Sequence, residues 1–173
     1  MKTRRSLKSR ALQLLAQRDQ SRLELRRKLL RHASADHVGT TEAESRPRGG
    51  AAEVDALLEW LEANRFLSDE RFVEARVHVR QARFGNLRIR SELAQHGVAA
   101  SAEVIQSLID SELARAAAVR ERRFRAFPRD AAERAAQARF LAARGFSPEV
   151  IHRLLRQPRQ PLASTSAGRG HIA

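Results

Sequence analysis

Apolar residues recur along this chain at intervals of three and four positions, the spacing of one face of an α-helix. No stretch alternates between apolar and polar residues with the period of two that marks a strand. We therefore predict an all-α protein, with Trp60 packed in its core beside the third stripe. The predicted helices cover residues 6–18, 21–33, 52–61, 70–82, 87–96, 101–109, 111–125, 131–144 and 148–155.

Capping residues mark the ends of these helices. Ser21 followed by Glu24 has the spacing of a capping box, and Ser68 or Asp69 is placed to cap the helix that begins at Glu70. Ser101 and Ser147 are also placed to cap two later helices, and Pro148, directly after Ser147, suits the first turn of the second of these. Gly97 fits a left-handed helix stop.

The helices repeat as a unit. Gly97 is matched by Gly145, 48 residues later, and the tripeptide Glu-Val-Ile follows both glycines, at 103–105 and at 149–151. A shift of 64 residues places Ser21 on Gly85 and aligns an earlier unit. Self-similarity of this kind predicts stacked units that bury their apolar faces against one another.

Three tandem three-helix repeats in an elongated, curved array are therefore expected. We place repeat 1 at residues 1–65, repeat 2 at 66–110 and repeat 3 at 111–156. Glycine, proline and serine without apolar period predict a flexible loop over 34–50 and a disordered tail over 157–173.

The charge of the chain narrows the class of partner. Its formal net charge is +13, and 30 of its 33 basic residues are arginine. This balance favours an acidic partner such as nucleic acid or an acidic protein face, and arginine adds planar, bidentate contacts. A GC-rich genome also encodes arginine-rich chains, so composition alone leaves both explanations open.

Position on the helices gives the arginines more meaning. On a helical wheel, Arg76, Arg80 and Arg83 border an apolar face formed by Phe72, Ala75, Val79 and Ala82. Either their heads pair with Asp69, Glu92 or Glu112 at the core edge, or they line a surface that receives a partner. The predicted binding residues are Arg76, Arg80, Arg83, Arg88, Arg90, Arg26, Arg27, Arg122 and Arg123.

Several kinds of chemistry find no support in the residues. Cysteine is absent, which excludes disulfides and thiolate sites, and the histidines show no metal-binding spacing. Gly49 and Gly50 lack the Gly-Lys-Ser/Thr ending of a phosphate-binding loop. No apolar run reaches the roughly 20 residues of a membrane span. We expect a cytoplasmic, monomeric protein with no catalytic residues, metal or cofactor.

The central repeat also carries a family resemblance. The patterns FLSDERFVEA over 66–75, RFGNLRIRSEL over 83–93 and HGV over 96–98 closely resemble the RecX regulatory proteins of bacteria. The resemblance extends over about residues 11–155, although the 34–50 loop is longer than expected and the tail is unmatched.

The resemblance implies tandem three-helix repeats and a non-enzymatic role. It implies binding to the RecA recombinase and to the groove of the RecA–single-stranded DNA filament. There the protein would limit filament extension and so damp recombination, ATP hydrolysis, coprotease activity and the SOS response. Weak contact with the DNA itself is also implied.

Two other functions remain open at this point. Three short helices with a glycine turn imitate a helix-turn-helix, with residues 87–96 as the recognition helix of a DNA-binding module that acts without RecA. The other alternative is a structural adaptor whose arginines reflect only genome composition.

Overall fold

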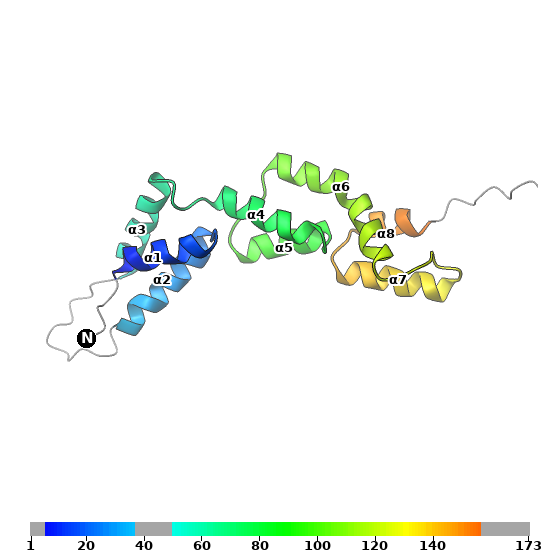
Figure 1. Cartoon of the computed structure of the whole chain (residues 1–173), viewed down its shortest axis with the longest axis horizontal. Helices are drawn as coiled ribbons and strands as arrows, with labels where there is room; N and C mark the ends of the chain where they lie inside the picture. Colours follow the sequence, from blue (N-terminus) through cyan, green and yellow to red (C-terminus); the bar gives the residue numbers. More distant parts are fainter. Residues whose placement is uncertain (1–5, 37–49, 157–173) are drawn as a thin grey trace, which may run out of the picture.

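The computed structural model describes residues 6–36 and 50–156, and these residues form eight α-helices and no strand. The helices form an elongated array, with the first three at one end and the last two at the other (Figure 1). The all-α prediction is confirmed. The helices are α1 (Leu7–Gln17), α2 (Arg22–Asp36), α3 (Ala51–Ala63), α4 (Asp69–Gln81), α5 (Asn86–Gln95), α6 (Ala102–Glu121), α7 (Ala131–Ala143) and α8 (Pro148–Leu155).

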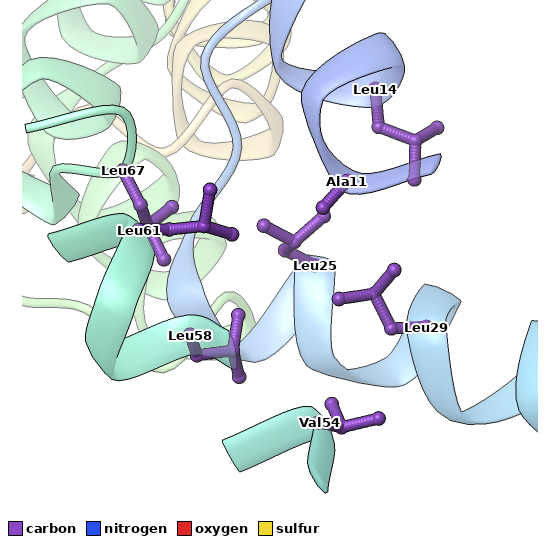
Figure 2. Packing of buried hydrophobic residues seen from close by; sticks show 8 residues of the cluster. All are labelled: Ala11, Leu14, Leu25, Leu29, Val54, Leu58, Leu61 and Leu67. Carbon is purple, nitrogen blue, oxygen red and sulfur yellow. The ribbon is translucent and has the colours of Figure 1, made fainter. Parts of the chain in front are cut away.

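Three separate apolar cores lie along the array, one for each repeat. In the first, leucines from α1, α2 and α3 converge on one another (Figure 2). The second gathers Phe72, Ile89 and Leu93, and the third is built around Leu141 and Phe146. Each core is small, as expected for a repeat protein in which a unit packs only against its neighbours.

The main correction to the predicted helices is at the start of the last repeat. Two helices were expected over 101–109 and 111–125, but α6 runs unbroken from Ala102 to Glu121. Neither glycine nor proline occurs in this segment, so the backbone has no reason to stop. The boundary that we placed between residues 110 and 111 therefore falls inside one helix, which links the second repeat to the third (Figure 1).

Other expectations were partly wrong. Helix α2 continues to Asp36, so the predicted loop begins later than residue 34, and residues 37–49 and 157–173 lie outside the described part of the chain. Trp60 is not in the core, because it is 37% exposed and stacks on Phe66 at the surface. The caps at Ser21, Ser68 and Ser101 are confirmed by side-chain hydrogen bonds.

The junction between the second and third repeats is a contact of backbone on backbone. Gly85 N–H donates to the carbonyl of Arg144 at 3.0 Å, and Leu87 N–H donates to that of Gly145 at 3.0 Å. Gly145 has a φ of 78°, the left-handed conformation in which a side chain is strained. A Cβ atom on Gly85 would lie 2.3 Å from the Gly145 carbonyl oxygen, so the two turns touch directly.

The first junction, between the first and second repeats, has a similar contact of turn on helix start, but a side chain takes part in it. Ser21, which corresponds to Gly85, donates its hydroxyl to the carbonyl of His96 at 2.8 Å. Gly97 follows with a φ of 71°, as predicted, and packs against Leu23 of α2. At both junctions, therefore, the turn that follows the second helix of one repeat packs against the start of the second helix of the preceding repeat.

A carboxylate seals each junction. Asp69 accepts a hydrogen bond from the backbone N–H of Arg22 at 2.7 Å, at the start of α2. Glu112 does the same for Asn86 at the start of α5 at 2.9 Å and also binds the N–H and hydroxyl of Ser147. Both carboxylates satisfy N–H groups that a helix leaves without internal partners, and both face the positive end of its dipole.

Candidate partner-binding surface

Helix α4 packs through a different face from the one predicted. Phe72, Val73 and Val77 are buried, whereas Val79 is 67% exposed. Ala75 and Ala82, the other members of the predicted face, are exposed too. The wheel gave the alanines and Val79 too much weight, because apolar residues also occur on the solvent-facing side of a helix.

This shift changes the place of the arginines. Arg76 and Arg80 fall between Phe72 and Val77 on the helix, inside the packed face and not along its border. Their side chains remain about one third exposed, at 34% and 29%. Arg83 lies beyond the end of α4 and is exposed.

Glu92 of α5 holds these cations together. Arg80 binds it with two parallel contacts, one of them from Nε to Oε2 at 2.6 Å. Arg88 Nε lies 3.4 Å from Oε1, and Arg76 Nε lies 3.8 Å from Oε2. The hydrogen bonds from Arg80 lower the pKa of Glu92 and outweigh the opposing effect of its burial. The predicted pairing with Glu92 is thus confirmed for Arg76 and Arg80.

Three of the predicted arginines meet at the turn that holds Phe84, and a fourth, Arg83, belongs to that turn. The guanidinium groups of Arg80 and Arg88 lie over its ring, at 4.6 and 4.5 Å from the ring centre. Arg122, at the end of α6, donates to the carbonyl of Ala82 at 3.3 Å and so reaches the same turn from the next repeat. We call Phe84 with Arg80, Arg83, Arg88 and Arg122 the Phe84 patch.

Arg115 supports this patch from below and was not predicted. Its guanidinium donates to the carbonyl of Phe84 at 2.8 Å and to the side chain of Asn86. It thereby fixes the turn between α4 and α5 against α6. The pattern that revealed the other arginines gave no signal for Arg115, since a single arginine in an alanine-rich helix resembles a solvated one.

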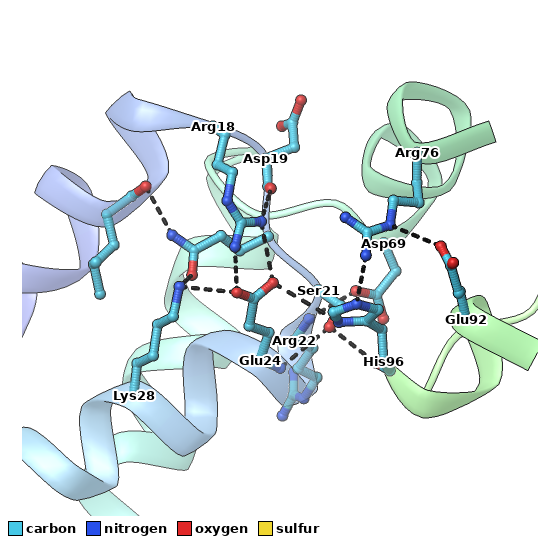
Figure 3. Close-up of polar contacts among 12 residues, drawn as sticks. Arg18, Asp19, Ser21, Arg22, Glu24, Lys28, Asp69, Arg76, Glu92 and His96 are labelled. Atoms are coloured by element: carbon cyan, nitrogen blue, oxygen red, sulfur yellow. Dashed lines mark hydrogen bonds and ion pairs between the residues drawn. The ribbon is translucent and has the colours of Figure 1, made fainter. Parts of the chain in front are cut away.

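A second carboxylate, Glu24 of α2, extends the basic surface into the first repeat (Figure 3). Arg18 donates to it at 3.1 Å and Lys28 lies 2.8 Å away. Burial raises the pKa of Glu24, but the bonds from Arg18 and Lys28 prevail and lower it to about 2.

His96 links the two carboxylate centres. Its Nδ1 lies 3.9 Å from Glu24, and its Nε2 lies 3.2 Å from a guanidinium nitrogen of Arg76, which in turn faces Glu92 (Figure 3). Its ring also meets the edge of Phe72, with 5.1 Å between the ring centres. The contacts form one line across the first junction.

A groove of about 670 Å³ between α2 and the end of α5 continues this line. Its walls include Glu24, His96 and three cations, Arg27, Lys28 and Arg31. We call the groove, the two carboxylate centres and the Phe84 patch together the basic strip. Its two carboxylates, Glu24 and Glu92, are far fewer than its cations, so the strip keeps a large excess of positive charge. Its cations are Arg18, Arg27, Lys28, Arg31, Arg76, Arg80, Arg83, Arg88 and Arg122.

Three of the predicted residues lie apart from the strip. Arg26 is taken up by Asp55 of α3 through two hydrogen bonds of 2.6 and 2.9 Å, so its role is to join two helices. Arg90 is exposed on the side of α5 opposite to Arg88 and Glu92. Arg123 lies beside Phe124, 5.8 Å from its ring centre.

The strip is suited to binding anions. Guanidinium groups recognise phosphate and carboxylate through paired hydrogen bonds, and Glu92 and Glu24 hold them in fixed positions. Within residues 6–36 and 50–156, no three acidic or histidine side chains gather to hold a metal ion. Across the same ranges, no helix is long and apolar enough to cross a membrane.

Comparison with known proteins identifies relatives of this chain. Residues 68–102 match the second three-helix domain of RecX, and residues 110–155 match the third. The regulatory protein RecX of Ralstonia nicotianae is 47% identical over 152 residues, which cover 87% of this chain and 86% of that protein. The regulatory protein RecX of Herbaspirillum seropedicae is 47% identical over 154 residues, with 88% of each chain covered.

A solved structure shares the fold. The crystal structure of RecX from Lactobacillus salivarius superposes with a TM-score of 0.63 over 86% of this chain and 92% of that one, at 14% sequence identity. This likeness supports the tandem three-helix architecture, although few residues of the two chains are identical. Taken with the closer relatives, it leaves one conclusion: this chain belongs to the RecX family of regulatory proteins.

Proposed function

We propose that the protein is a non-enzymatic regulator that binds the RecA recombinase and the filament that RecA forms on single-stranded DNA. By binding, it lowers the recombination, ATPase and coprotease activities of RecA, and so damps the SOS response. It acts in the cytoplasm as a monomer. Membership of the RecX family is the observation that carries this proposal.

The basic strip supports the proposal physically. It crosses the junctions of the array and presents cations whose intramolecular carboxylates are too few to neutralise them. A filament offers acidic protein surface and DNA phosphates along its length, and an elongated array follows such a target over several subunits. Binding of this kind weakens steeply as salt rises.

The proposed contact residues divide into two groups. Arg83 and Arg122 are exposed and free of carboxylate contacts within the described residues, so we assign them to direct contact with the partner. Arg76, Arg80 and Arg88 share Glu92, so they shape the surface while contributing part of its charge.

The helix-turn-helix alternative is disfavoured by the position of α5. A recognition helix presents its N-terminal residues to the bases of the major groove. At the start of α5, Gly85 and Asn86 are buried against the turn of the third repeat and against Glu112. The end that would read DNA is therefore covered.

The decisive experiment measures ATP hydrolysis by RecA on single-stranded DNA with the full chain present in equal amount. We expect inhibition, and an unchanged rate would refute the proposal. Replacing both Arg83 and Arg122 by Glu should weaken inhibition at least tenfold, since charge reversal repels an anionic partner. Replacing both Arg90 and Arg123 by Glu is the matched control, because both are exposed and lie outside the strip.

A further inference from the structure

The third repeat contains an apolar groove apart from the basic strip. It has a volume of about 880 Å³ and lies between α7 and α8, where Leu87 of α5 closes one side. Phe146, Ile151 and Leu155 are buried beneath it, whereas Leu87 is 52% exposed. We call it the α7–α8 groove. Its apolar lining residues are Leu87, Ala138, Ala142, Phe146, Pro148, Ile151 and Leu155.

The charged side chains of this groove all have one sign. Arg134, Arg139 and Arg156 line it together with His152, and no acidic residue does. Within the described ranges, none of the three guanidinium groups meets a carboxylate. This contrasts with the basic strip, where Glu92 and Glu24 hold most of the cations. The groove therefore combines apolar walls with cations that still lack an acidic partner.

We propose that the α7–α8 groove binds an amphipathic helical segment of a partner protein, with large aliphatic side chains on one face and carboxylates beside them. The aliphatic side chains would lie over Ile151 and Leu155, and the carboxylates would pair with Arg134, Arg139 and Arg156. A helix that lays an apolar face into a groove is a common mode of peptide recognition. Because Leu87 belongs to the second repeat, the bound segment contacts two repeats at once.

Charge disfavours the other occupants. The chain's own residues 157–173 contain Arg159 and Arg169 but no acidic residue, so the cations of the groove repel them. A second copy of this chain carries a net charge of +13 and is repelled as a whole. Nucleic acid would satisfy the arginines but leave the apolar floor without a matching surface.

This inference goes beyond the proposed function and does not depend on RecA. The test uses the full chain with isotope-labelled methyl groups and two synthetic helical peptides. Both peptides carry leucines along one face, flanked by glutamates in the first peptide and by lysines in the second. The glutamate peptide should shift the methyl signals of Leu87, Ile151 and Leu155, with a Kd on the order of 100 μM. The lysine peptide should bind at least tenfold more weakly.

Ala142→Glu should weaken binding of the glutamate peptide at least tenfold, since it places a carboxylate in the groove. Ala136→Glu is the matched control, because Ala136 is exposed on α7 but does not line the groove. If circular dichroism shows that Ala142→Glu perturbs folding, Arg139→Gln replaces it and should also weaken binding.

Four results would overturn the inference. The first is no shift of these methyl signals, and the second is equal binding of both peptides. The third is concentration-dependent shifts without peptide, which would identify a second copy as the occupant. The fourth is tighter binding of single-stranded DNA at the same methyl groups. Because no RecA is present, the regulatory role succeeds or fails independently of each of these results.

Discussion

Neighbouring arginines in this protein have different tasks, and their contacts distinguish them. Arg80 binds Glu92 twice and lies over the ring of Phe84, whereas Arg83, three residues later, has no carboxylate contact within the described residues. A shared position in the sequence motif therefore does not imply a shared role. One side chain stabilises the second repeat, and the other is the one that we propose for direct contact with a partner.

Stability measurements should separate the two roles. Arg80→Ala removes two charged hydrogen bonds from a partly exposed pair, so we expect the free energy of unfolding to fall by about 1 to 2 kcal/mol. Arg83→Ala should change it by less than about 0.5 kcal/mol, as for an ordinary surface position. Urea unfolding followed by circular dichroism tests both variants. Equal losses would show that the contact with Glu92 does not contribute to stability.

Glu24 should make the stability of the first repeat depend on pH. Its pKa in the folded protein is about 2, below the ordinary value of 4.5, so its ionised form is favoured by folding. This stabilisation is complete above pH 4.5 and is lost as the pH falls toward 2. Glu24→Gln should therefore lower the free energy of unfolding by about 2 kcal/mol at pH 7, and this difference should shrink toward pH 2.

Trp60 makes this measurement specific, since it is the only tryptophan and belongs to α3 of the first repeat. Its fluorescence during urea unfolding reports that repeat directly. Glu74→Gln is the control, because Glu74 is exposed and makes no ion pair within the described residues. A difference between Glu24→Gln and the unsubstituted protein that stayed constant with pH would contradict the assigned role.

At the scale of elements, the two junctions are the parts of the fold where close contact most restricts which residues fit. The Gly85 and Gly145 turns touch through backbone atoms, and Glu112 accepts hydrogen bonds from residues that follow both glycines. Nothing flexible lies between the turns, so a side chain has no space to enter. The orientation of the third repeat on the second is therefore fixed by the absence of side chains at these positions.

Gly85→Ala should lower the free energy of unfolding by about 3 kcal/mol or more, because the new Cβ atom meets backbone that cannot move aside. Gly85 has a φ of −80°, which any residue adopts, so the whole effect is steric. Gly50→Ser is the control, since a Cβ atom at Gly50 meets nothing within 4 Å and serine is a good N-cap. Thermal unfolding followed by circular dichroism measures both, and a loss below about 1 kcal/mol for Gly85→Ala would mean that the junction adapts.

Local signals predicted most of these elements. The caps at Ser21, Ser68 and Ser101 and the left-handed stop at Gly97 are confirmed because each depends on a few adjacent residues. The continuity of α6 was missed because the repeat pattern placed a boundary where the backbone has no reason to break. Periodicity describes how units resemble one another and does not show whether a helix passes from one to the next.

The candidate surface was less predictable, because it depends on contacts between helices. Sequence identified Arg80 and Arg88, which lie over the ring of Phe84, and Arg122, which reaches the same turn. It did not reveal that Arg26 is occupied by Asp55, which lies 29 residues away in the chain. Charge is visible in a sequence, but neutralisation by a distant carboxylate appears only when the helices are packed.

At the scale of the whole molecule, the two junctions differ in kind. The first depends on polar and charged contacts, among them the ion pair of Arg71 with Asp19 and the line from Glu24 through His96 to Arg76, and only the short segment 64–68 connects its repeats. The second depends on backbone contact and on α6, which runs through both of its repeats. Repeat proteins unfold together only while the interfaces between units remain strong.

Salt should therefore separate the unfolding of the first repeat from that of the rest. At low ionic strength we expect Trp60 fluorescence and circular dichroism to change together with urea. In about 1 M salt the Debye length falls to about 3 Å, and the ion pairs of the first junction weaken far more than the backbone contacts of the second. The fluorescence transition should then move to lower urea than the main loss of helix. Coincident transitions at both salt concentrations would show instead that Ser21, Gly97 and Leu23 hold the first junction without help from its charges.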